Sequence, residues 1–171
     1  MTVVGKKLIR VMGLALLIVT GLQALPAQAN TSPLINVQWL LANPASATRV
    51  LLDLRDPRSY VASHIPGAVH TDYGMDGWRQ MIDKVPGLLP TKGPQLDKLV
   101  RRIGQLGISN SSHVVLVAPG WSAGDMGMAT RLYWSLKVLG HDRVSILDGG
   151  MAAWLADMKA DRKTPRNPLR R

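Results

Sequence analysis

Three short, predominantly apolar runs constrain the fold of this chain more than any other feature of its sequence. They span residues 50–54, 113–117 and 144–147, and a polar or glycine-rich loop follows each of them. Runs of this length indicate strands that are buried on both faces, which is typical of parallel sheets. Segments with helical spacing of apolar residues separate the runs, so we expect an α/β fold with helices on both faces of the sheet.

The helical segments have recognisable ends. Residues 94–106 place leucine, valine and isoleucine at three- and four-residue spacing and end before Gly107, which predicts a helix there. Further helices are expected at about 125–139 and 151–159, with a brief one after the N-cap residue Asn36 and a short strand at 68–70. Because parallel sheets form their sites at the carboxyl ends of strands, the loops after Leu54, Val117 and Leu147 are the candidate locations.

The two ends of the chain differ from its middle. Residues 1–29 combine a basic start, an apolar run and a final Ala-Gln-Ala, which is typical of a signal peptide cleaved after Ala29. A retained anchor is the alternative, although the run is shorter than the roughly 20 residues of a spanning helix. We therefore expect a periplasmic or secreted domain at 30–158, with no stable membrane span after cleavage, and a basic, disordered tail at 159–171.

Charge argues against a nucleic-acid partner. The formal net charge is +10, but only about +2 of it belongs to residues 30–158, because the basic residues gather at the two ends. A nearly neutral domain does not predict a nucleic-acid groove.

Five motifs in order resemble the rhodanese family of sulfurtransferases, over residues 34–154. They are Leu-Asp-Leu-Arg at 52–55, Tyr60, His-Ile-Pro-Gly-Ala at 64–68, the strand at 114–117, and Leu-Asp-Gly-Gly at 147–150 with Trp154. These motifs include Asp53, His64, Pro66, Gly67, Asp148, Gly149 and Gly150. Residues 129–134 and 140–142 resemble more particularly the first half of tandem thiosulfate or 3-mercaptopyruvate sulfurtransferases. The resemblance implies an open parallel sheet of about five strands.

The chain contains no cysteine. In the rhodanese family, a cysteine directly after the strand that matches 114–117 takes up sulfur as a persulfide, and the matching residue here is Ala118. A methyl group can neither attack a sulfur donor nor carry a persulfide. In tandem members the first domain usually lacks the cysteine too and packs against the catalytic second domain. The resemblance therefore implies a sulfurtransferase family but predicts that this chain alone is inactive.

Further residues near the strand ends are candidates for a site, and two of them, Arg55 and Ser122, have alternative interpretations. The candidates for the anion or substrate side are Arg55, Ala118, Gly120, Trp121, Ser122 and Gly124. Arg55 could hold an anion, or it could form an ion pair with Asp53, Asp56 or Asp72. Ser122 could be a nucleophile, although no Ser/His/Asp order supports it, or a solvated loop residue.

The other histidines and tryptophans have structural readings. His64 is expected to hold the turn of its motif, and His70 with Asp72 provides too few ligands for a metal. Trp39, Trp134 and Trp154 are predicted to be core residues, and Trp121 is either an exposed anchor or folded back onto Trp78 or Met126. No cofactor and no metal are expected.

The sequence favours a non-catalytic binding or pairing module. Its loop at Ala118 would face a catalytic rhodanese domain or another envelope protein. The alternative is one half of a sulfurtransferase whose catalytic domain is on another chain or was lost by truncation. Binding of a small sulfur-containing anion at Arg55 and the loop amides is a third hypothesis.

Overall fold

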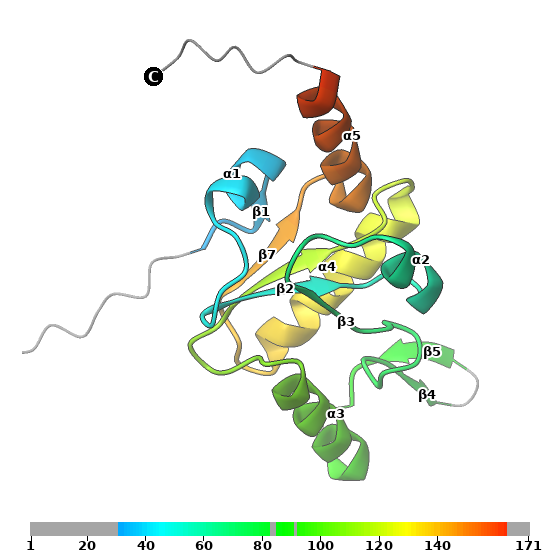
Figure 1. Cartoon of the computed structure of the whole chain (residues 1–171). Coiled ribbons are helices and arrows are strands. Elements are labelled where there is room, and N and C mark those ends of the chain that lie inside the picture. Colours follow the sequence, from blue (N-terminus) through cyan, green and yellow to red (C-terminus); the bar gives the residue numbers. More distant parts are fainter. Residues whose placement is uncertain (1–30, 83–84, 91, 164–171) are drawn as a thin grey trace, which may run out of the picture.

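The computed structural model describes residues 31–82, 85–90 and 92–163, and its centre is a five-stranded parallel sheet (Figure 1). The strand order is β1-β7-β6-β2-β3. The strands are β1 (Leu34–Ile35), β2 (Arg49–Asp53), β3 (Ala68–His70), β6 (His113–Val117) and β7 (Val144–Leu147). Every pairing in this sheet is parallel, which confirms the predicted fold class.

Helices cover the sheet on both faces, and each face has its own core. One core joins side chains of α3 (Gly93–Gln105) and α4 (Ala123–Val138) to alternate residues of β2, β6 and β7. The other core joins α1 (Val37–Ala42) and α5 (Gly150–Lys163) to the intervening residues of the same strands, whose side chains point to the opposite face of the sheet. Thus Val114 and Leu116 face one core while Val115 and Val117 face the other. All four are fully buried, because both faces of a central parallel strand are covered.

Capping explains where the helices begin and end. Asn36 caps α1 as expected, because its side chain accepts a hydrogen bond from the Trp39 amide at 2.8 Å. Helix α4 begins at Ala123, two residues before the predicted start, because Ser122 and Asp125 form a capping box. Helix α5 continues to Lys163, past the predicted end near Lys159, since good helix formers precede the proline at 165.

Three features differ from the sequence prediction. Residues predicted as a polar loop form α2 (Pro57–Ala62), and an antiparallel hairpin of β4 (Gln80–Ile82) and β5 (Val85–Leu88) was not predicted. The prediction that Trp134 is a core residue is wrong: 55% of its surface is exposed, on the outward face of α4. The fully buried apolar residues of α4 are Ala129, Leu132 and Leu136, on the opposite side of the helix.

The predicted signal peptide at 1–29 and the residues after 163 lie outside the described part of the chain. None of the helices that the structure describes combines the length and the apolar character needed to cross a membrane.

Candidate functional site

The loops that follow β6 and β7 pack tightly against each other at the carboxyl edge of the sheet. Gly120, Gly149 and Gly150 all have positive φ values, at 85°, 67° and 53°. A Cβ added at Gly120 would overlap the Gly149 carbonyl, and one added at Gly150 would overlap the Ala118 carbonyl. Glycine is therefore required where the two backbones meet.

Ala118 lies at the centre of this contact. Its side chain is buried among the core residues beside α4, and 4% of the residue surface is exposed. Its carbonyl accepts a hydrogen bond from the Met151 amide at 2.8 Å, and the Pro119 carbonyl accepts one from the Ala152 amide at 3.0 Å. The backbone at position 118 is thereby fixed to the first turn of α5.

A small pocket of about 160 Å³ adjoins Ala118. Its walls come from the loops after β6 and β7 and from α4: Ala118, Gly120, Ser122, Met126, Ala129, Ile146, Leu147, Asp148, Gly149 and Gly150. Asp148 supplies the one charged side chain in this lining. The described residues of the lining therefore provide no cation that would attract an anion.

Asp125 occupies the loop amides in front of α4. Its Oδ2 accepts hydrogen bonds from the amides of Trp121, at 2.8 Å, and Ser122, at 3.0 Å. The Ser122 Oγ in turn accepts one from the Asp125 amide at 3.2 Å. A carboxylate of the chain itself thus fills the place where a helix start would offer N–H groups to an anion.

Ser122 is therefore a helix cap. Its hydrogen-bonded neighbours in the described structure are backbone and carboxylate groups, and no contact described there joins it to a histidine. The Ser-x-x-Asp spacing at 122–125 is a capping signal that sequence reasoning could have used.

Trp121 lies at the tip of the same loop and is exposed over 74% of its surface. Trp78, onto which it could have folded, is buried and donates its Nε1–H to the Thr71 hydroxyl at 2.8 Å. The loop thus presents a large aromatic side chain to solvent beside Gly124, which is also exposed.

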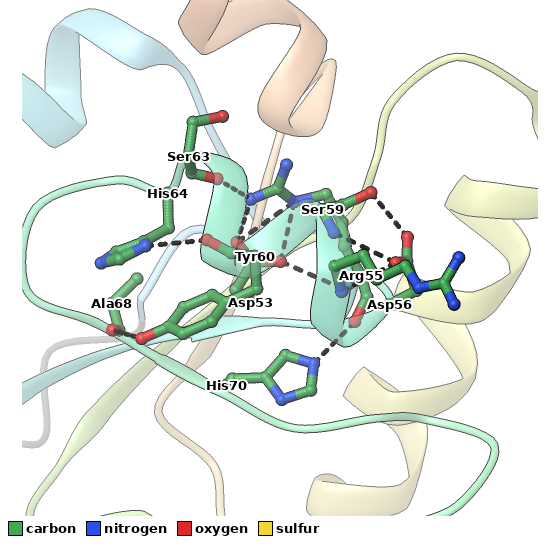
Figure 2. A network of polar contacts seen from close by, with 10 residues as sticks. Asp53, Arg55, Asp56, Ser59, Tyr60, Ser63, His64, Ala68 and His70 are labelled. Carbon is green, nitrogen blue, oxygen red and sulfur yellow. Dashed lines mark hydrogen bonds and ion pairs between the residues drawn. The ribbon is translucent and has the colours of Figure 1, made fainter.

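Arg55 is buried and forms an ion pair with Asp53 (Figure 2). Its Nη2 donates to Asp53 Oδ2 at 2.7 Å, and its Nε donates to Asp53 Oδ1 at 3.0 Å. The Ser63 carbonyl accepts a further hydrogen bond from Nη2 at 2.5 Å. This pairing is one of the alternatives that the sequence left open, and it ties the end of β2 to the end of α2.

The neighbouring motif residues hold the turn between α2 and β3. The His64 Nδ1 lies 2.9 Å from the Tyr60 carbonyl, and its ring stacks on the Tyr60 ring with centroids 4.2 Å apart. Tyr60 donates its hydroxyl to the Ala68 carbonyl at 2.8 Å. After the exposed Pro66, Gly67 has a φ of 78° and passes so close to Ala45 that a Cβ would lie 2.8 Å away. Figure 2 shows Tyr60 and His64 side by side at the end of α2, with Ala68 next to the Tyr60 hydroxyl.

Asp56 was not a predicted site residue, yet it caps α2. Its Oδ1 accepts from the amides of Arg58 and Ser59, each at 3.0 Å, and its Oδ2 accepts from the Ser59 hydroxyl at 2.6 Å. The Ser59 hydroxyl contributes most to holding the pKa of Asp56 below its ordinary value. Asp followed by Pro at a helix start was a readable signal for this helix.

His70, whose pairing with Asp72 was predicted to provide too few ligands for a metal, lies near this cluster. Its Nε2 lies 2.8 Å from the Arg55 carbonyl. Among the residues that the structure describes, no group of three metal-ligating His, Cys, Asp or Glu side chains comes together.

Known proteins share this sequence pattern and fold. The sequence model of the rhodanese-like domain family matches residues 36–157 of this chain. A thiosulfate sulfurtransferase from Pseudomonas aeruginosa is 37% identical over 117 residues, which are 68% of this chain and 40% of that protein. The mitochondrial thiosulfate/3-mercaptopyruvate sulfurtransferase 1 of Arabidopsis thaliana is 30% identical over 137 residues, or 75% of this chain and 34% of its own length.

A solved structure agrees with these relatives. The crystal structure of the 3-mercaptopyruvate sulfotransferase SseA from Escherichia coli superposes with a TM-score of 0.52 at 26% identity, and the match covers 75% of this chain and 50% of that one. The chain thus spans half or less of these relatives. It belongs to the rhodanese-like domain family, and it is a member without cysteine that is related to sulfurtransferases.

Proposed function

We propose that this domain is a non-catalytic binding or pairing module of the cell envelope. The feature that carries the proposal is Ala118, which the family resemblance places at the position of the cysteine and whose methyl group is buried against the core. The chain contains no cysteine at any position, so no neighbouring thiol can replace the missing one.

The polar groups near Ala118 are already hydrogen-bonded within the chain, which favours binding of a protein partner over binding or chemistry of a small anion. The Trp121 and Ser122 amides already donate to Asp125, and the Arg55 guanidinium already donates to Asp53 and Ser63. An anion would have to displace these partners before it could use either group. This argues against the anion-binding hypothesis.

The exposed loop supports a protein partner. Trp121 stands on a backbone that hydrogen bonds and close glycine contacts fix to α5, so little ordering would be needed on binding. Exposed tryptophans are over-represented among residues that dominate interface energies. We propose a cysteine-bearing rhodanese domain as the partner, with another envelope protein as the alternative, because the relatives are named as sulfurtransferases and extend well beyond the matched region.

A sulfur-transfer assay tests the missing activity. The chain is purified from the envelope fraction of an expressing bacterium and incubated with thiosulfate or 3-mercaptopyruvate and cyanide. We expect no thiocyanate above the buffer blank, whereas a cysteine-bearing rhodanese run in parallel produces it. Turnover by this chain that survives repurification would contradict the proposal.

A binding measurement tests the pairing role. A cysteine-bearing rhodanese domain from the same genome is titrated against the wild type, Trp121→Ala and Trp134→Ala. Trp134 is a matched control, because it is also exposed but lies on the outer face of α4. We expect Trp121→Ala to weaken binding at least tenfold and Trp134→Ala to leave it unchanged. Equal affinity of the wild type and Trp121→Ala would exclude the loop as the contact surface.

A further inference from the structure

The outward face of α4 combines small residues in its first half with large residues in its second. Ala123 and Gly127 lie in the first half, whereas Trp134 and Val138, exposed by 55% and 48%, lie in the second. A shallow pocket of about 510 Å³ lies over this face, with Gly127, Thr130, Arg131 and Trp134 in its lining. Apart from its two chain neighbours and the nearby backbone of its own helix, no described atom lies within 4 Å of a Cβ built at Gly127. The face therefore carries both a projecting side chain and a space beside it.

The spacing of these residues makes the face complementary to itself. Positions 123, 127, 130, 134 and 138 recur at three- and four-residue intervals, so they form one stripe along the helix. If a second α4 packs antiparallel about an axis between Thr130 and Arg131, position 127 of one helix meets position 134 of the other. Position 123 likewise meets position 138. Each large side chain then lies opposite a small one.

We propose that the outward face of α4 binds the same face of a second copy of this chain. The two Trp134 side chains fill the spaces over the two Gly127 residues, which gives a two-fold interface in which every contact occurs twice. Glycine at 127 lets the helices approach to the short end of the usual range of roughly 8–10 Å between axes. This inference rests on α4 and is independent of the proposed function of the Ala118 loop.

The size of the face predicts a weak dimer. A helix of 16 residues is about 24 Å long. One helix face of that length is small beside the roughly 800 Å² that each partner contributes to a standard interface. We therefore expect association in the micromolar range or weaker.

The absence of cysteine allows a direct test by disulfide trapping. Thr130 lies next to the proposed axis and is exposed. The hydrogen bonds that the described structure shows for its hydroxyl go to the Met126 and Gly127 carbonyls of its own helix. Thr130→Cys is compared with Val61→Cys, whose position is 79% exposed on α2. Both variants are oxidised at a protein concentration of about 100 μM, near the expected dissociation constant. Covalent dimer is then followed on a non-reducing gel.

We expect Thr130→Cys to form covalent dimer at least ten times faster than Val61→Cys. Adding Gly127→Met to Thr130→Cys should reduce the rate to that of the control, because the methionine fills the space that Trp134 needs. The same change should not lower the melting temperature, because the site is open and methionine favours helix more than glycine does. Equal rates for the two single-cysteine variants, or a rate that Gly127→Met leaves unchanged, would overturn the proposal.

Discussion

The buried ion pair between Asp53 and Arg55 is expected to make the stability of this domain sensitive to the loss of either partner. Asp53 is fully buried and Arg55 is 8% exposed. Asp53 accepts hydrogen bonds from the Arg55 amide, Nε and Nη2. Asp53→Ala would leave a buried guanidinium with one hydrogen-bond partner that the structure describes, the Ser63 carbonyl. Removing one partner of a buried ion pair costs about 3–5 kcal/mol, because the remaining charge is uncompensated.

A control comes from the exposed pair of Lys137 and Asp142. Its two charged atoms lie 3.2 Å apart, and the Asp142 side chain is 74% exposed. Because water screens such a pair, Asp142→Ala should cost no more than about 1 kcal/mol. The double variant Asp53→Ala/Arg55→Ala should lose less than the sum of the two single variants, since it leaves no unpaired charge.

Urea unfolding at pH 7, followed by far-ultraviolet circular dichroism, measures these free energies. We expect Asp53→Ala to lower the unfolding free energy by at least about 3 kcal/mol and Asp142→Ala to lower it by less than about 1 kcal/mol. A loss below about 1 kcal/mol for Asp53→Ala, or strict additivity in the double variant, would refute the view that Asp53 compensates a buried charge on Arg55.

Three further predictions concern the loop, the core and position 118. Gly120→Ala should lower the free energy of unfolding by about 1–3 kcal/mol, because φ is positive and the methyl would overlap the Gly149 carbonyl. Gly104→Ala in α3, where no neighbour is close, should raise it by up to about 1 kcal/mol. Chemical unfolding distinguishes the two variants. Burial, with smaller effects from Arg49 and Arg143, lowers the pKa of His113 to about 4, so the unfolded state gains the proton first as pH falls from about 6.5. The wild type should therefore lose up to about 3 kcal/mol between pH 7 and pH 4 relative to His113→Gln, and parallel unfolding profiles would contradict this. The thiol of Ala118→Cys should have a pKa at or above about 8.5, because the site is buried and Asp125 already accepts hydrogen bonds from the nearby loop amides. The rate of alkylation by iodoacetamide as a function of pH measures this pKa. A pKa below about 7 would contradict the reasoning.

The sequence determined the fold class because the apolar runs leave few alternatives. Strands without a polar face must be covered on both sides, and helices between them lead to a parallel sheet. The sequence also determined that no thiol is present, and the resemblance of its motifs predicts that Ala118 stands where the family has its cysteine. These conclusions depend on residue identity and spacing along the chain, and both can be read before the chain folds.

Only the tertiary structure decided which partners the polar residues take. Arg55 had three candidate carboxylates within a short stretch of sequence, and only the geometry after β2 selects Asp53. The role of Ser122 was left open, because a capping hydrogen bond depends on where the helix begins. The prediction for Trp134 was wrong, because exposure depends on which face of α4 the sheet covers. Burial and hydrogen bonding depend on the position of every neighbouring element in space, and the local pattern of residues does not contain that information.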